Sequence, residues 1–407
     1  MKLATARRYT LLGTLYFAQG LPFGFFSIAI PVLLREQGVP LAKIGLVMLL
    51  NAPWALKFVW APYVDRKYIP RIGRRRTWIL AMQLAGTVAL TTMALVPKLT
   101  ELMPLLGAMF VLNLIAATQD IATDGLAVEL LPPEERGVAN GLQVAAYRAG
   151  MIIGGGVLPG FNDDIGLQGI FGVMAGLTIL STIPVLVSRE PDTITPDAAA
   201  PSVHFLKLPG VAPVLALVII YKFGEAAAQN MLKPFLVDHH LTLGDIAWIL
   251  GTVGAFAGMA GALVGGYAVE HLGRKRAMVI FGFGQIVTVL GYAYLAFATP
   301  SYHELYVWAG VEHFASGSAT AALFTAMMDW SRPEASGTDY TVQASAVVIS
   351  TGIAGMLGGV SAQLLGYGGH FIFTAVLCAG AVIATLALFP MRGFPISAGP
   401  ESPRHPT

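Results

Sequence analysis

Apolar runs long enough to cross a lipid bilayer recur along almost the entire sequence. A crossing needs about 20 helical residues, and twelve such runs lie at 9–34, 43–64, 77–97, 102–130, 137–160, 167–187, 211–236, 244–269, 276–298, 303–330, 338–366 and 370–391. Charged residues make up 12% of the chain and the mean hydropathy is +0.67, whereas a soluble domain carries about 25% charged residues. The sequence therefore predicts an all-α membrane protein with twelve transmembrane helices.

The segment between the sixth and seventh runs is rich in Pro, Ala and Asp, which is typical of a flexible connector. We therefore expect an N-terminal six-helix bundle at 1–187, a cytoplasmic linker at 188–210 and a C-terminal six-helix bundle at 211–392. The Pro- and Ser-rich tail at 393–407 is expected to be disordered.

Two short basic stretches look like copies of one loop. The first is APYVDRKYIPRIGRRR at 61–76, and the second is GYAVEHLGRKR at 266–276. Each follows an apolar run, carries an acid, a glycine and a block of Arg and Lys, and leads directly into the next run. Asp65 and Glu270 are 205 residues apart, about half the chain. A pattern repeated at half the length is typical of transporters built from two similar halves.

The second copy has the spacing G-x-x-x-[D/E]-x-x-G-R, which resembles the signature loop of the major facilitator superfamily, found between helices 2 and 3 and again between helices 8 and 9. On this resemblance the gating residues are Asp65, Arg66, Gly73, Arg74, Arg75, Gly266, Glu270, Gly273 and Arg274. We expect the acids to bind a basic residue or a helix N-terminus in one state and to release it in the other.

A second repeat supports two bundles related by pseudo-two-fold symmetry. Pro133, Glu134, Gly137 and Gln143 recur 200 residues later as Pro333, Glu334, Gly337 and Gln343. When the turns are assigned alternately to two sides, eighteen Lys and Arg fall on the side of the N-terminus, three on the other side and four within spans. Because Lys and Arg concentrate in cytoplasmic loops, we expect both termini in the cytoplasm. The basic loops contribute to this bias whether or not they form a gate.

Polar side chains interrupt the apolar runs at a few positions, where a functional site is expected because they are costly in hydrocarbon. In the first half, we expect the cavity to be lined by Gln19, Asn113, Gln119, Gln143, Tyr147 and Arg148. Asp120 and Asp124 are i,i+4 neighbours on one face of the fourth helix. They are the candidates for proton coupling in this half.

Asp120 and Arg148 are predicted to lie at the same depth. Each stands about fourteen residues from the turn between Pro132 and Glu135, which is about 20 Å into a core about 30 Å thick. One interpretation is a structural ion pair between two helices. In the other, Arg148 binds an anionic substrate and Asp120 or Asp124 responds to protons.

The second half carries a matching set of polar residues. Lys222, Glu225 and Gln229 recur at i, i+3 and i+7 of one predicted helix. Lys222 and Glu225 either neutralise each other or serve binding and coupling, and His313 either relays protons or forms an interhelical hydrogen bond. For this half we expect a cavity lined by Lys222, Gln229, His313 and Gln343, and proton coupling at Glu225 or Glu312. Lys57 lies seven residues from the first basic turn, and we expect its ammonium to snorkel to the cytoplasmic surface.

A narrower resemblance covers about a quarter of the chain in both halves. The segments are GLPFGFFSIAIPVLLREQGVPLAKIG (20–45), APWALKFVWAPYVDR (52–66), QDIATDGLAVELLPPEERG (119–137), AAYRAGMIIGGG (145–156), KFGEAAAQNMLKPFLVDH (222–239) and SGTDYTVQAS (336–345). They resemble the AmpG-like permeases, a branch that includes muropeptide importers and acetyl-CoA transporters. The start of the chain and its compact length are also similar to siderophore permeases of the RhtX/FptX type. This resemblance implies proton-driven uptake across a bacterial inner membrane, with key positions at Asp120, Asp124, Arg148, Lys222 and Glu225.

We therefore expect an alternating-access symporter that imports an anionic or amphipathic solute, such as a siderophore, together with protons. The alternatives are a muropeptide (GlcNAc-anhydroMurNAc-peptide) permease and, in another class, a non-transporting membrane sensor. The expected partners are a small-molecule substrate, protons and the lipid bilayer, and we expect a monomer.

Other classes of function fit the sequence poorly. The net charge of +2 argues against a nucleic-acid partner. The single cysteine, Cys378, excludes a Cys-based metal site, and we expect no metal or cofactor. The sequence contains neither H-E-x-x-H nor G-x-S-x-G, so we do not expect an enzyme.

Overall fold

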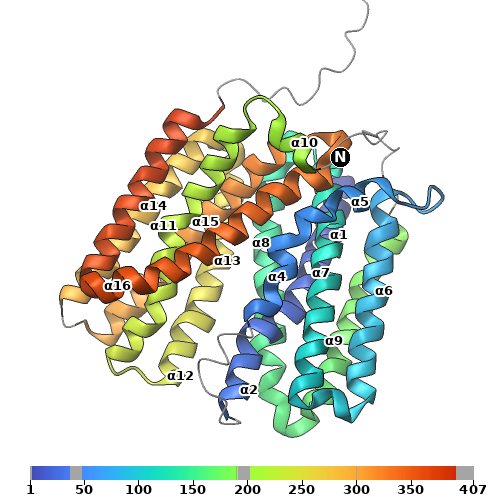
Figure 1. Ribbon diagram of the computed structural model, residues 1–407, viewed down its shortest axis with the longest axis horizontal. Coiled ribbons are helices and arrows are strands. Elements are labelled where there is room, and N and C mark those ends of the chain that lie inside the picture. Colours follow the sequence, from blue (N-terminus) through green and yellow to red (C-terminus); the bar gives the residue numbers. More distant parts are fainter. Residues whose placement is uncertain (1, 37–47, 189, 191–201, 299, 391–407) are drawn as a thin grey trace, which may run out of the picture.

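The computed structural model describes residues 2–36, 48–188, 190, 202–298 and 300–390, and every element named within them is a helix. The first half (blue to green in Figure 1) begins with α1 (Lys2–Gly24), η1 (Phe25–Ala29) and α2 (Ile30–Glu36). The second crossing is a broken helix made of η2 (Met48–Asn51), α4 (Ala52–Leu56), η3 (Lys57–Val59) and α5 (Ala61–Arg66). Pro53 and Pro62 lie in the first turns of α4 and α5, where a missing backbone N–H costs nothing.

The rest of the first half is made of long helices. They are α6 (Arg74–Leu95), η4 (Pro97–Thr100), α7 (Leu102–Leu130), η5 (Pro133–Glu135), α8 (Arg136–Ile152), η6 (Ile153–Val157), η7 (Pro159–Phe161) and α9 (Asn162–Val187). Most of the expected linker lies outside the described residues, but its end forms a short helix, α10 (Ser202–Lys207), with Phe205 buried. This part of the linker is ordered because Phe205 packs beside Val211 and Val342.

The second half repeats this order. Its elements are α11 (Val211–Asp238), α12 (Leu243–Ile246), η8 (Ala247–Val253), α13 (Gly254–Leu272), α14 (Arg274–Phe297), α15 (Tyr302–Asp329), η9 (Pro333–Ala335) and α16 (Ser336–Leu388). The expected disordered tail, 393–407, lies outside the described residues.

The described helices account for the expected crossings. Eight of them are long and apolar enough to span a membrane. Two of these eight reverse direction at a glycine with positive φ, Gly166 (64°) in α9 and Gly366 (67°) in α16, so each contains two crossings. The α4–α5 segment and α15 supply the remaining two. The predicted all-α fold with two helical bundles is confirmed.

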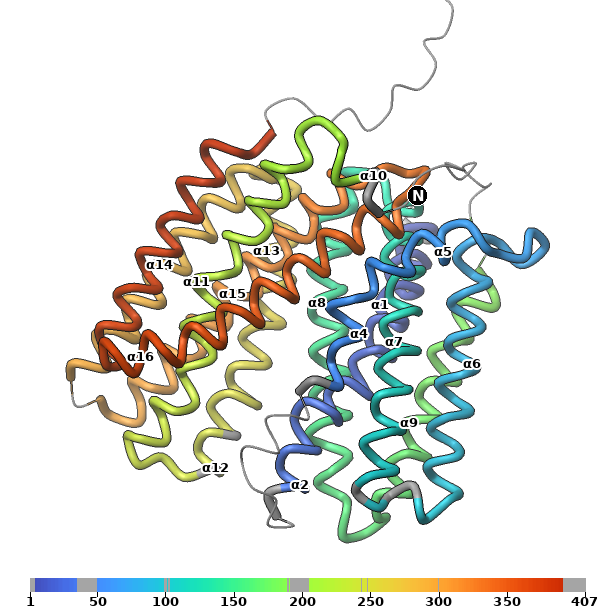
Figure 2. The backbone as a smooth tube through the Cα atoms, viewed as in Figure 1, coloured from blue at the N-terminus to red at the C-terminus, as the bar shows by residue number. Residues whose placement is uncertain are grey.

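The two halves lie side by side and are packed together at one end (Figure 2). This end carries the loop 67–73, the turn at Gly273 and α10, and we call it the basic end. A shared apolar core lies there, in which Leu12 and Ala139 of the first half pack with Val214, Met278 and Ala319 of the second. Toward the opposite end the helices of the two halves diverge (Figure 1).

Each half has its own apolar core toward the opposite end. One contains Phe25, Met109 and Phe171 of the first half. The other contains Phe235 and Tyr292 of the second half, with further residues of the same half. Among the described residues, the large apolar core shared by the two halves therefore lies at the basic end, whereas the cores toward the opposite end each belong to one half.

Candidate functional site

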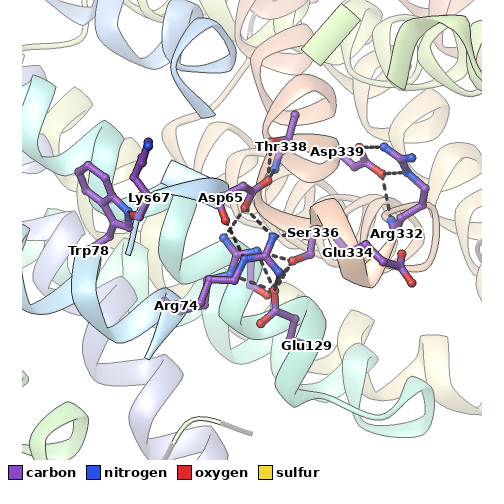
Figure 3. A network of polar contacts seen from close by, with 12 residues as sticks. Asp65, Lys67, Arg74, Trp78, Glu129, Arg332, Glu334, Ser336, Thr338 and Asp339 are labelled. Carbon is purple, nitrogen blue, oxygen red and sulfur yellow. Dashed lines mark hydrogen bonds and ion pairs between the residues drawn. The ribbon is translucent and has the colours of Figure 1, made fainter. Parts of the chain in front are cut away.

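Asp65 holds the basic end of the first half to the second half (Figure 3). This residue lies in the last turn of α5 and is 4% exposed. Its Oδ2 accepts hydrogen bonds from the backbone N–H of Thr338, at 2.7 Å, and from the Thr338 hydroxyl. Thr338 is in the first turn of α16, so the carboxylate binds a helix N-terminus, where the helix dipole favours negative charge. Its Oδ1 accepts a hydrogen bond from Arg75.

Arg74 and Arg75, in the first turn of α6, extend this contact. Arg75 donates to Glu129 and to the Ser336 hydroxyl, both at 2.7 Å. Arg74 donates to the backbone carbonyl of Glu334 at 2.8 Å. Both guanidinium groups are almost completely buried. Because Glu334 and Ser336 precede and begin α16, the cluster joins α5, α6 and α7 to the second half.

The charge of Asp65 is stabilised by these neighbours. Burial alone would raise the pKa of the Asp65 carboxyl, but the guanidinium groups of Arg75 and Arg74 and the hydrogen bond from Thr338 outweigh it. The pKa of Asp65, which directly follows the apolar run at 43–64, is therefore below its ordinary value of 3.8.

The second half makes the corresponding contacts in the opposite direction. Glu270, near the end of α13, accepts a hydrogen bond from the backbone N–H of Val138, in the first turn of α8, at 2.9 Å. Asp329, at the end of α15, accepts from Arg274 at 2.6 Å and from Arg136 at 2.8 Å. Each half therefore presents an acid to the start of a helix in the other half.

These contacts are related by a shift of 200 residues. The matched pairs are Val138 and Thr338, Glu129 and Asp329, Arg74 and Arg274, and Gly73 and Gly273. Gly73 and Gly273 precede α6 and α14 with φ of 111° and 77°, values that favour glycine. We call this set the gate network: Asp65, Arg74, Arg75, Glu129, Arg136, Glu270, Arg274, Asp329, Ser336 and Thr338.

Sequence reasoning found only part of the gate network. Glu129 and Asp329 were missed, although their separation of 200 residues matches that of Arg74 and Arg274. Gly266 lies at a close helix crossing, since a Cβ on it would come within 2.4 Å of the Gly137 carbonyl oxygen. Arg66 stays a predicted gating residue. Its side chain is exposed and makes no hydrogen bond or ion pair with another described residue, because it faces away from the buried side of α5 that Asp65 occupies.

Nearer mid-depth, Lys57 lies between two carboxylates of α7. Its ammonium forms an ion pair with Asp120 and is 3.9 Å from Asp124 Oδ2. Tyr16 donates to Asp124 Oδ1 at 2.7 Å. The Lys57 side chain is 2% exposed, so the expected snorkelling to the surface is wrong. The ammonium is directed at α7, whose carboxylates compensate its charge.

The other predicted residues of the first half surround this cluster. Gln19 donates to Thr123 at 3.2 Å, and Asn113 accepts from the Trp54 indole at 3.1 Å. Tyr147 packs beside the rings of Phe23 and Trp54 at centroid distances of 5.6 and 6.5 Å. Gln119 and Gln143 are buried, at 5% and 8% exposure, and each has a buried polar atom without a hydrogen bond among the described residues.

Arg148 is not the partner of Asp120. Among the described residues it makes no hydrogen bond or ion pair. Its guanidinium lies against Gly258 of α13, where a Cβ would come within 1.9 Å of Nη1. It is close enough to Glu225 and Glu312 of the second half to interact with them electrostatically. An equal depth along two helices does not fix the direction in which each helix presents a side chain.

In the second half, Glu225 is the centre of a hydrogen-bond network. It forms an ion pair with Lys222 and accepts from Gln229 at 3.2 Å, from Gln285 at 2.9 Å and from the Ser316 hydroxyl. Neither Gln285 nor Ser316 was singled out in the sequence. The predicted stripe of α11 is therefore brought together, with α14 and α15 supplying the additional donors.

Glu312 and His313 adjoin this network. Glu312 accepts from Gln229 at 2.8 Å and lies 3.0 Å from His313 Nδ1. His313 Nδ1 is also 2.9 Å from the Ala309 carbonyl oxygen. Gln343 lies elsewhere. It is fully buried and donates to the Met327 carbonyl oxygen and to the Ser331 hydroxyl, both at 3.1 Å, so it fastens the α15–α16 connection instead of lining a cavity.

Comparisons with known proteins place both halves in one family. The Major Facilitator Superfamily model matches residues 12–299 and 214–406. The anhydromuropeptide permease of Escherichia coli K12 is 28% identical over 93% of this chain and 79% of its own length. An uncharacterised protein of Haemophilus influenzae is 28% identical over 92% and 93%. The putative transporter AmpG 4 of Rickettsia conorii is 25% identical over 91% and 93%.

Solved structures share the fold at low sequence identity. The human organic anion transporter MFSD10 superimposes with a TM-score of 0.74 at 12% identity, over 94% of this chain and 99% of that one. The transporter FucP in its outward conformation gives 0.73 at 13% identity, over 95% and 99%. The resemblance to AmpG-like permeases is thus confirmed by relatives, and the chain belongs to the Major Facilitator Superfamily.

Proposed function

We propose that this secondary transporter imports an anionic sugar–peptide of the anhydromuropeptide class together with protons, acting as a monomer in a bacterial inner membrane. The observation that carries the coupling is the cluster of Lys57, Asp120 and Asp124. Two buried carboxylates share one ammonium, which leaves one negative charge uncompensated. Binding a proton neutralises it, whereas an uncompensated charge in a low-dielectric interior is costly.

Arg148 supports an anionic substrate. A guanidinium near mid-depth without a hydrogen-bond partner among the described residues is costly, and a carboxylate of the substrate would supply the missing acceptors in bidentate geometry. Glu225 and Glu312 face it from the other half. A substrate carboxylate would compete with these acids for Arg148, so binding couples the two halves electrostatically.

The relatives guide the choice of substrate. The E. coli relative is named for anhydromuropeptides and the R. conorii relative as a putative AmpG transporter. An anhydromuropeptide carries peptide carboxylates, which suits Arg148. The siderophore expected from the sequence stays a prediction.

The shared core at the basic end and the diverging opposite end support alternating access. The excess of Lys and Arg at the basic end supports a cytoplasmic position for it. In that orientation the gate network closes the cytoplasmic side, and the substrate reaches Arg148 from outside. Breaking the contacts of Asp65 and Glu270 with the two helix starts would then open the path inward.

Uptake in right-side-out membrane vesicles tests the proposal. Labelled GlcNAc-anhydroMurNAc-peptide should accumulate when the outside is acidic, and excess unlabelled ferric siderophore should not compete. Asp120→Asn and Asp124→Asn should each lose accumulation while retaining exchange of labelled for unlabelled substrate, which shows that the variant is folded. Asp163→Asn, at an exposed acid, is the matched control.

Two results would contradict the proposal. If both Asn variants accumulate substrate as the unaltered protein does, these acids do not couple protons. If the unaltered protein binds the labelled substrate but neither accumulates nor exchanges it, the protein is a sensor.

A further inference from the structure

The first turns of α6 and α14 are equivalent positions in the two halves, but they are completed differently. In the first half, the carboxylate of Glu190 accepts from the backbone N–H of Arg75 at 2.9 and 3.1 Å and from that of Arg76 at 3.2 Å. A Cβ built on Gly73 would lie 2.3 Å from Glu190 Oε2. A negatively charged group thus fills the space in front of α6.

In the second half, no described residue fills the corresponding space. The residue 200 positions after Glu190 is Pro390, which has no carboxylate. A Cβ built on Gly273 would have no atom within 4 Å. A cavity of about 430 Å³ lies here at the basic end, bordered by the first turn of α14, by Trp330 and by Phe389. Among the described residues, no acceptor meets the backbone N–H groups of Lys275 and Arg276.

The cavity is positively charged. Arg274, Lys275 and Arg276 line it, with Asp329 as the one acid among the described lining residues. Arg274 is already paired with Asp329, and Lys275 donates to the Leu386 carbonyl oxygen at 2.8 Å. Arg276 makes no hydrogen bond or ion pair with another described residue. The lining therefore has two more basic than acidic side chains, and it includes a helix N-terminus. Both features favour the binding of an anion in this cavity.

We propose that this cavity binds a phosphate-type oxyanion, held by the backbone N–H groups and side chains of Lys275 and Arg276. The anion does for α14 what the Glu190 carboxylate does for α6. The source is either the headgroup of an acidic phospholipid or soluble phosphate, since both present the same oxygens. A bound anion would fix the start of α14, and with it the Arg274–Asp329 pair of the gate network. The site lies away from Arg148 and does not depend on the transported substrate.

Replacing Pro390 tests the site, because the repeat indicates where an internal carboxylate would fit. Pro390→Glu should supply the missing group and exclude the anion, whereas Pro390→Gln, of similar size and neutral, should not. The purified full chain is loaded with phosphatidylglycerol or phosphatidylcholine, and bound lipid is counted by native mass spectrometry. Separately, inorganic phosphate is titrated in detergent while the unfolding temperature is followed.

A lipid source predicts that the unaltered protein and Pro390→Gln retain phosphatidylglycerol about tenfold better than Pro390→Glu, with no difference for phosphatidylcholine. If soluble phosphate is the source, added phosphate should raise the unfolding temperature of the unaltered protein and of Pro390→Gln, but not that of Pro390→Glu. The Lys275→Gln, Arg276→Gln double variant leaves position 390 intact and should lose the same binding. Equal responses of that double variant and the unaltered protein to both probes would overturn the proposal, whatever Pro390→Glu does.

Discussion

The two halves resemble each other closely at the basic end and differ near mid-depth. At the basic end, Asp65 binds the N–H of Thr338 and Glu270 binds the N–H of Val138. The two acids are 205 residues apart and the two N–H groups 200. Near mid-depth, Lys57 pairs with an acid on another element, whereas Lys222 pairs with Glu225 on its own helix. The repeated contacts suit a motion that both halves share. The unrepeated ones suit tasks that each half performs alone, which we propose are coupling and binding.

The basic end is itself uneven in burial. The side chains of Arg74 and Arg75 are 1% and 0% exposed, whereas those of Arg274 and Asp329 are 20% and 27% exposed. Breaking a buried ion pair costs more than breaking an exposed one, because water cannot compensate the remaining charge. The first-half side of the gate network should therefore hold the closed state more strongly than the second-half side.

Asp65→Asn should have the largest effect on the closed basic end. The amide would remove one of the two carboxylates that Arg75 binds, leaving only Glu129. It would also set an N–H₂ group against either Arg75 or Thr338, at a cost of about 3–5 kcal/mol. Spin labels on Lys67→Cys and His271→Cys, both exposed, would report the opening as a longer distance between labels. The native Cys378 is 2% exposed and should not be labelled. An unchanged distance distribution would show that Asp65 does not hold the gate.

The Arg148→Gln substitution should have the next largest effect, on substrate binding near mid-depth. Loss of a charge-assisted contact worth about 1.5–3 kcal/mol should weaken substrate binding about tenfold to a hundredfold. Arg148→Lys should retain part of the affinity. Lys233→Gln, at an exposed lysine of α11, is the control and should bind normally. Calorimetric titration gives the affinities, and equal values for Arg148→Gln and the control would remove Arg148 from the binding site.

Glu270→Gln should perturb the gate less than Asp65→Asn. The amide oxygen can still accept from the Val138 N–H, so only the charge at the helix N-terminus is lost, at a cost of about 0.3–1 kcal/mol. The same label pair measures both variants under one set of conditions. If Glu270→Gln opens the gate as far as Asp65→Asn does, the two sides of the gate network stabilise the closed state equally. That result would contradict the prediction from their difference in burial.

The smallest expected effect is that of pH on the closed gate. Because the pKa of Asp65 lies below 3.8 in the folded protein, its contribution is fully present above that value and is lost only as pH falls through the lower folded pKa. The label distance should therefore stay constant from about pH 8 to pH 5 in the absence of substrate. A shift within that range would assign proton sensing to the gate instead of to Asp120 and Asp124.

The sequence predicted the fold and the gate acids, because both depend on patterns along the chain. The lengths of the apolar runs predicted the membrane crossings, and the pattern repeated at half the chain length predicted Asp65 and Glu270 as gate residues. The direction of a side chain around its helix axis is not encoded in that way. Arg148 and Asp120 were predicted to lie at the same depth, but they contact different neighbours.

Lys57 was misjudged for a related reason. Its distance from the nearest basic turn suggested a surface position, but Lys57 begins the 3₁₀ turn η3 within a broken helix, and its side chain reaches α7. No run of residues indicates that break except the prolines at 53 and 62. Gln343 was expected to line the cavity and lies 200 residues after Gln143 in the repeat. The repeat does not show whether a residue lines a cavity or, as Gln343 does, connects two helices.

The proton bound at Lys57, Asp120 and Asp124 can be measured directly. Substrate is added to purified protein in weakly buffered solution near pH 7, and the change in bulk pH gives the protons bound per protein. We expect uptake of about one proton by the unaltered protein and none by the Asp120→Asn, Asp124→Asn double variant. Equal uptake by both proteins, or no uptake by a protein that binds substrate, would contradict coupling at this cluster.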